Sequence, residues 1–97
     1  MIPVLISEAA LRDIEDIWAF VSLESPESDT ALIRLLLERA FSLREFPGAG
    51  AAVSGHPGTR RVLVRTWAIF YEIAPSHVEV VRIVHGGRDV NALRLQS

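Results

Sequence analysis

The chain has 97 residues, which suffice for one domain with a single modest core. Cysteine is absent, which excludes disulfides, thiolate nucleophiles and cysteine metal sites and predicts a reducing, cytoplasmic environment. All 10 basic residues are arginine. Because a guanidinium stays protonated in a protein, none of them can serve as a general base.

Charge is divided unevenly along the chain. Residues 1–55 hold nine acids and four arginines, net −5, and residues 56–97 hold three acids and six arginines, net +3, which together give −2. Such halves usually form solvated faces of opposite sign, although a basic face also suits an acidic partner or nucleic acid. Hydrophobic residues make up 49% of the chain and the mean hydropathy is +0.28, so we expect apolar surface that a partner covers.

The first half of the chain predicts a short strand and two helices. Residues 2–6 form an apolar run that is too short and lacks the basic flank needed for a signal peptide or a membrane span. Ser7 is the expected helix cap. The helix that follows has one apolar stripe that predicts core positions, including Trp18, with Asp13 on the solvated face. The stripe consists of Leu11, Ile14, Ile17, Trp18 and Val21.

A second helix restarts at Ser25-Pro26 and ends at Phe46-Pro47. It has more apolar residues than one sheet-facing stripe requires, so part of it is expected to face a partner. These residues are Leu32, Ile33, Leu35, Leu36, Leu37, Ala40, Phe41 and Leu43. The segment 48–58 is rich in glycine and predicts an exposed loop.

Three strands with period-2 alternation are expected after the loop. The first places Val62 and Val64 opposite Arg61, Leu63 and Arg65. The second places Trp67, Ile69, Tyr71 and Ile73 opposite Ala68, Phe70 and Glu72, and the third places Val78, Val80, Arg82 and Val84 opposite Glu79, Val81 and Ile83. Both faces of this sheet are partly apolar. Since helices cover one face only, the other is expected to be open or covered by another chain.

Five motifs in this order resemble the ParE branch of the RelE/ParE superfamily of bacterial toxins. They are residues 10–18 (ALRDIEDIW), Phe46-Pro47 with Gly50, residues 58–61 (GTRR), residues 67–71 (WAIFY) and residues 81–89 (VRIVHGGRD). The resemblance implies an α+β fold of the order β-α-α-β-β-β, with a helical hairpin packed on a mainly antiparallel four-stranded sheet. A single toxin domain spanning residues 1–97 is therefore expected.

The resemblance also implies a type II toxin-antitoxin module. ParE relatives inhibit DNA gyrase by binding, which leads to growth arrest and plasmid stabilisation, and RelE relatives cleave messenger RNA on the ribosome. A ParD-like antitoxin that folds on binding is the implied partner, in a hetero-oligomer, without cofactor, membrane or sequence-specific nucleic acid. Because both branches share one scaffold, side-chain chemistry has to decide between them.

Cleavage of RNA through its 2′-hydroxyl requires a proton acceptor, a proton donor and cations around the phosphate. Lysine is missing and the only tyrosine, Tyr71, lies within a strand, which disfavours a nuclease. His85 is the remaining candidate, since its unperturbed pKa of about 6.5 suits proton transfer. The ribonuclease alternative would use His85, Arg61, Arg65 and Arg88. A histidine beside Gly86-Gly87 more often fixes a chain corner through the backbone, and no histidine spacing indicates a metal site.

The sequence thus predicts a non-enzymatic toxin with two binding regions. Target contacts are expected from the basic corner of the sheet and the segment after it, namely Arg61, Arg82, Arg88 and Asp89. Antitoxin contacts are expected from exposed positions on the second helix and from part of the sheet, namely Leu32, Leu36, Phe41, Trp67 and Tyr71. A ribosome-dependent ribonuclease and a non-toxic remnant that still binds antitoxin are the alternatives.

Overall fold

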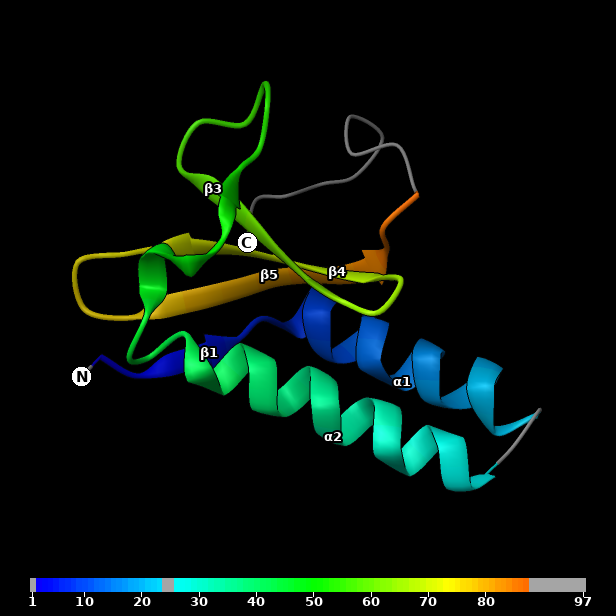
Figure 1. Ribbon diagram of the computed structural model, residues 1–97. Helices are drawn as coiled ribbons and strands as arrows, with labels where there is room; N and C mark the ends of the chain where they lie inside the picture. The colour runs from blue at the N-terminus through cyan, green and yellow to red at the C-terminus, as the bar shows by residue number, and fades with distance from the viewer. Residues whose placement is uncertain (1, 24–25, 88–97) are drawn as a thin grey trace.

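Two helices cover one face of a five-stranded sheet in the computed structural model, which describes residues 2–23 and 26–87 (Figure 1). The elements are β1 (Val4–Ile6), α1 (Glu8–Ser22), α2 (Pro26–Ser42), a 3-10 turn (Pro47–Ala49), β2 (Ala51–Ala52), β3 (Thr59–Val64), β4 (Trp67–Ile73) and β5 (Val78–His85). The strand order is β1-β5-β4-β3-β2, and only β1 and β5 are parallel. This confirms the predicted α+β class. The predicted strand number was wrong, because Ala51–Ala52 in the expected loop pairs with β3.

The helical hairpin buries one row of side chains from each helix against the sheet. Ala10 and Ile17 of α1 lie in the core. The α2 row repeats at helical spacing and consists of Leu32, Leu36, Ala40 and Leu43. On the sheet, Val62, Ile69, Tyr71, Val78, Val80 and Ile83 complete this core. The predicted alternation in β3 is confirmed, since Val62 is buried and Val64 packs on the core while Arg61 and Leu63 are exposed.

Two predictions about α1 were wrong. Trp18, expected in the core, is 49% exposed, and Asp13, expected in solvent, is 8% exposed. The reason is that α1 turns Ala10, Asp13 and Ile17 inward, a row offset from the apolar stripe that hydropathy alone selects. An acidic side chain therefore occupies a buried position, and it needs a partner there.

A β-bulge reverses the side-chain alternation in the middle of β5. Tyr71 pairs with Val80 and Phe70 pairs with Arg82, which leaves Val81 as the extra residue. Ile83 therefore joins the helix-facing core, whereas Val81 and Val84 join a second cluster with Ala68 and Phe70. The predicted face of Ile83 and Val84 was wrong for this reason. These four residues of the second cluster are at most 5% exposed, so the prediction of an open or partner-covered face was also wrong for them.

Tyr71 anchors the 3-10 turn to the sheet. Its hydroxyl accepts a hydrogen bond from the Gly50 N–H at 2.8 Å and donates one to the Pro47 carbonyl at 2.6 Å. A Cβ at residue 50 would lie 2.7 Å from that hydroxyl and 2.9 Å from the Arg61 carbonyl, so only glycine fits. Tyr71 is fully buried, so it has no free surface for the predicted contact with the antitoxin.

Candidate partner-binding site

An apolar groove of about 620 Å³ runs along the outer side of α2. Its apolar lining is Trp18 from α1 with Ile33, Leu37 and Phe41 from α2. Four charged residues surround it with balanced signs, namely Arg34, Glu38, Arg44 and Glu45. Trp18 and Phe41 are 49% and 41% exposed, so two large rings face solvent in one concave surface. Such a surface is typical of a protein-binding site.

The groove exists because α2 has two adjacent apolar rows. Leu32 and Leu36 belong to the inner row, which packs on the sheet. Each residue advances an α-helix by about 100°. The next position along therefore starts an outer row, whose members Ile33, Leu37 and Phe41 are spaced by four residues and line the groove. The surplus of apolar residues in the sequence is thereby explained. Leu32 and Leu36 are 6% and 0% exposed, so the prediction that they face the antitoxin was wrong, and Phe41 has the exposure that this role requires.

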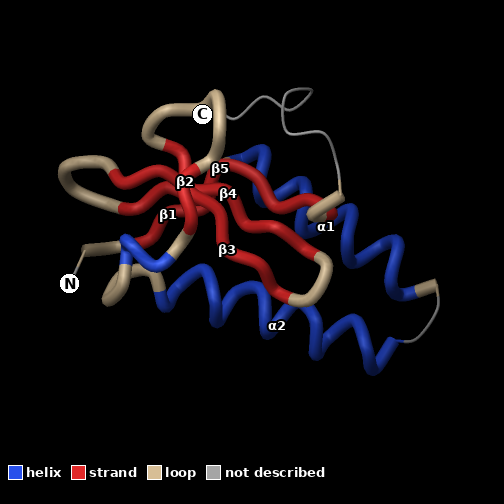
Figure 2. The backbone as a smooth tube through the Cα atoms, turned by 45° about the horizontal axis from the view of Figure 1, so that its top comes forward, coloured by secondary structure: helices blue, strands red, loops and turns tan. Residues whose placement is uncertain are grey.

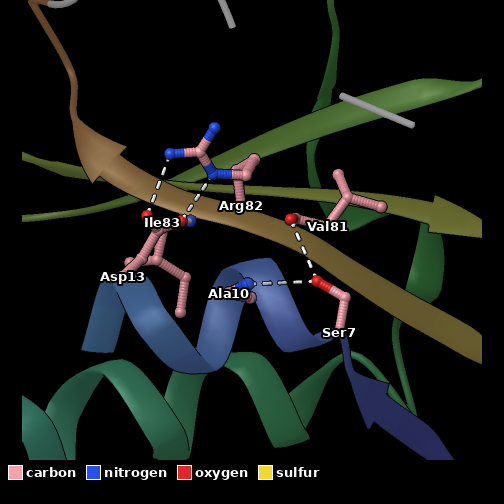
Figure 3. Close-up of polar contacts among 6 residues, drawn as sticks. All are labelled: Ser7, Ala10, Asp13, Val81, Arg82 and Ile83. Carbon is pink, nitrogen blue, oxygen red and sulfur yellow. Dashed lines mark hydrogen bonds and ion pairs between the residues drawn. The ribbon is translucent and has the colours of Figure 1, made fainter. Parts of the chain in front are cut away.

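Asp13 connects α1 to the edge of β5 (Figure 3). Its Oδ2 accepts hydrogen bonds from Arg82 Nε at 2.7 Å and from the Ile83 N–H at 2.9 Å, and its Oδ1 accepts one from Arg82 Nη2 at 2.9 Å. The hydrogen bonds to Asp13 raise the pKa of the Arg82 guanidinium more than any other contact does. Partial burial of Arg82 lowers this pKa, whereas the negative charges of Asp13 and Asp16 raise it further. Arg82 is therefore charged at every physiological pH and is committed to an internal partner.

The same region shows why this carboxylate is needed. β1 ends at Ile6, opposite Val80, so no described strand lies beside the rest of β5 on that edge. Ser7 supplies the next partners, because its N–H donates to the Val80 carbonyl at 3.0 Å and its hydroxyl donates to the Val81 carbonyl at 3.1 Å. The hydroxyl also caps α1 by accepting from the Ala10 N–H at 3.1 Å, which confirms Ser7 as the helix cap. Asp13 then satisfies the Ile83 N–H.

Of the predicted target-binding residues, the structure describes Arg61 and Arg82, which flank Phe70 in the register of the sheet. Arg61 is exposed on β3, whereas Arg82 has a side chain that is only 18% exposed and bonded to Asp13. The structure thus gives Arg82 an internal role that the sequence did not reveal. Arg88 and Asp89 lie outside the described residues.

His85 lies at the exposed end of β5 beside Trp67. The two rings meet edge to face, with centroids 5.8 Å apart. His85 Nδ1 accepts a hydrogen bond from the Gly87 N–H at 3.2 Å, the corner-fixing contact expected for this histidine. The described residues that line the adjacent hollow are carboxylates and hydrophobic side chains without an arginine, namely Asp13, Asp16, Ile17, Phe20, Trp67, Ile83 and Val84. Trp67 is partly buried there, away from the groove, so it does not extend the surface formed by Trp18 and Phe41.

Residues 2–23 and 26–87 contain neither a metal-binding cluster nor a membrane-spanning helix. No group of three histidine or acidic side chains in this part of the chain is arranged to hold a metal ion. Neither described helix has the length and apolar content to cross a bilayer.

Comparison with solved structures identifies the same fold in several bacterial toxins. A chain of the chromosomal ParDE toxin-antitoxin system of Pseudomonas aeruginosa superposes with a TM-score of 0.75 at 20% identity, covering 88% of this chain and 96% of that one. A chain of the RelBE2 complex of Mycobacterium tuberculosis gives 0.63 at 21% identity, covering 87% and 96%. A mutant of the Escherichia coli toxin RelE in the free state gives 0.63 at 16% identity, covering 89% and 84%. At sequence identities this low, the structural similarity shows a shared fold and nothing further.

Sequence comparison identifies the family. No curated protein matches this chain. The family model for the ParE toxin of the type II toxin-antitoxin system parDE matches residues 4–90, which include both helices, all five strands and the groove. The chain therefore belongs to the ParE toxin family of type II toxin-antitoxin systems.

Proposed function

We propose that this chain is the toxin of a type II toxin-antitoxin module, that it inhibits DNA gyrase by binding rather than by catalysis, and that an antitoxin neutralises it by covering the groove of α2. The observation that carries the antitoxin part is the groove itself, with Trp18 and Phe41 half exposed in one apolar hollow. Membership of the ParE family and the antitoxin complexes formed by structural neighbours support the same partner.

Side-chain chemistry supports binding over RNA cleavage. The chain has no lysine, and the hydroxyl of its single tyrosine, Tyr71, is used to hold Gly50 and Pro47. The described lining of the hollow beside His85 contains Asp16 and the Arg82-paired Asp13 but no arginine, so it offers no cation to hold a phosphate there. Arg61 is exposed on β3, and we propose that it meets an acidic surface of the target.

A supercoiling assay tests the target. The purified chain should block the supercoiling of relaxed plasmid by DNA gyrase, and prior mixing with the protein encoded by the adjacent reading frame should restore it. Full supercoiling at excess toxin would contradict the proposal. Cut messenger RNA in a translation extract, lost in a His85→Ala variant, would instead establish the ribonuclease alternative. A chain that binds the neighbouring protein without either effect would be a non-toxic remnant.

The groove is tested by a matched pair of phenylalanine variants. Phe41→Ala removes a ring that lines the groove, whereas Phe46→Ala removes a ring that is 65% exposed and outside its lining. Buried aromatic anchors contribute about 2 kcal/mol or more at protein interfaces, so Phe41→Ala should weaken antitoxin binding by about 30-fold. Phe46→Ala should leave affinity nearly unchanged. Calorimetric titration measures both, and equal affinities for the two variants would place the antitoxin elsewhere.

A further inference from the structure

The outer side of the helical hairpin is open. The five strands lie on the other side of α1 and α2, and no described element covers the outer side (Figure 2). The groove faces outward there, and its lining includes Trp18, Leu37 and Phe41. Trp18 and Phe41 are 49% and 41% exposed. Because large apolar rings are costly to leave in water, this side of the hairpin is suited to a partner.

The charges around the groove have both signs and no internal partner. They are Arg34, Glu38, Arg44 and Glu45. Among the described residues, neither the ion pairs nor the hydrogen bonds of side chains involve any of the four. A partner of one sign would attract two of these charges and repel the other two. A second copy of this chain presents two arginines and two glutamates in return, and its net charge of −2 adds little repulsion.

A two-fold axis across the groove brings opposite charges together. Arg34 and Glu38 are four residues apart and therefore lie on one flank of α2. If a second α2 packs antiparallel to the first with its Glu38 opposite Arg34, the symmetry forms the same ion pair twice. In this register Leu37 lies beside the Leu37 of the second copy, and Phe41 lies beside its Ile33. One arrangement thus joins the apolar linings of both grooves and places Arg34 and Glu38 against opposite charges.

We propose that the free chain forms a two-fold symmetric homodimer through the groove, with the α2 helices of the two copies packed antiparallel, and that the antitoxin displaces the second copy. Burial of Trp18 and Phe41 supplies most of the affinity, and the two ion pairs between Arg34 and Glu38 fix the register. The dimer itself is independent of the proposed function. Only the displacement rests on it, because the antitoxin is expected to bind the same groove.

Charge reversal at two positions tests the register. Arg34→Glu sets two glutamates opposite each other across the axis, and Glu38→Arg sets two arginines there. Sedimentation equilibrium should show that each variant alone dimerises at least about tenfold more weakly than the wild type. An equimolar mixture of the two variants should dimerise as tightly as the wild type, because every pair then joins opposite charges. Arg65→Glu, an exposed reversal outside the groove lining, should leave dimerisation unchanged.

The outcomes separate this inference from the proposed function. A wild type that stays monomeric up to about 1 mM, or a mixture that fails to recover the affinity, would overturn the homodimer and leave the antitoxin proposal intact. Single variants that dimerise as tightly as the wild type would overturn it as well. A dimer that does not bind the protein from the adjacent reading frame would overturn the proposed function and leave the homodimer standing.

A second pair of variants decides the question if a charge variant does not fold. Phe41 is 41% exposed, so Phe41→Ala should leave the fold intact, as circular dichroism can verify. It removes a ring from the groove and should weaken dimerisation at least about tenfold. Phe46→Ala removes a ring outside the groove lining and serves as the control. Equal dimerisation of these two variants would overturn the proposal.

Discussion

Replacing Asp13 with alanine should lower the free energy of unfolding by about 3 kcal/mol or more, among the largest effects of any single substitution in this chain. The carboxylate accepts three hydrogen bonds and is 8% exposed. Its removal leaves the Arg82 guanidinium and the Ile83 N–H without their partner, and breaking a buried ion pair costs about 3 to 5 kcal/mol. Urea unfolding followed by circular dichroism measures the change.

Asp16→Ala provides the control for Asp13→Ala, because Asp16 lies on the same helix and is exposed. It should change stability by less than about 0.5 kcal/mol. The double variant Asp13→Leu/Arg82→Met should recover part of the stability that Asp13→Ala loses, because replacing both members of a buried pair with apolar residues leaves no unpaired charge. The recovery should be incomplete, because the Ile83 N–H stays without its acceptor. Equal stability of Asp13→Ala and Asp16→Ala would show that the connection between α1 and β5 contributes nothing to folding.

Leu36→Ala should destabilise the fold by about 2 to 5 kcal/mol, the range measured for truncating a fully buried leucine. Leu36 is 0% exposed in the inner row of α2, where the deleted atoms would leave a cavity against the sheet. Thermal unfolding measures the effect. The neighbouring Leu35 is 36% exposed, so Leu35→Ala should cost about 1 kcal/mol or less.

The contrast between these leucines also tests the corrected assignment of α2. If Leu36 faced a partner in the way the sequence suggested, Leu36→Ala would weaken antitoxin binding and leave the melting temperature of the free chain unchanged. The packing of Leu36 in the core predicts instead that Leu36→Ala mainly lowers the stability of the free chain and affects antitoxin binding less. A free chain that melts at the same temperature as the wild type would therefore contradict the placement of Leu36 in the core.

Several features of the fold could be predicted because they depend on neighbours in the sequence. Ser7 caps a helix through the N–H of Ala10, three residues away, and the alternation of β3 follows from the period of an extended chain. The excess of apolar residues on α2 correctly indicated a second apolar row outside the core. Hydropathy could not say which leucines formed it, because Leu36 and Leu37 are equally apolar and only packing on the sheet distinguishes them.

The candidate sites depended more heavily on contacts between distant segments. Asp13 and Arg82 are 69 positions apart, and nothing local marks either as a member of a buried pair. The bulge at Val81 reverses the faces of Ile83 and Val84, which no periodic pattern can anticipate since a single extra residue changes the register. The pairing of β2 with only two residues of β3 likewise arises from the path of a loop.

The sequence by itself therefore determined the order of the main elements, the helix cap, the surplus apolar row and the family resemblance, because each depends on local propensity or on motifs along the chain. Tertiary structure alone decided which side of α2 enters the core and which arginine is bound internally. These are outcomes of packing and hydrogen bonding between segments far apart in sequence. Their energies are realised only when the sheet and the helical hairpin are brought together.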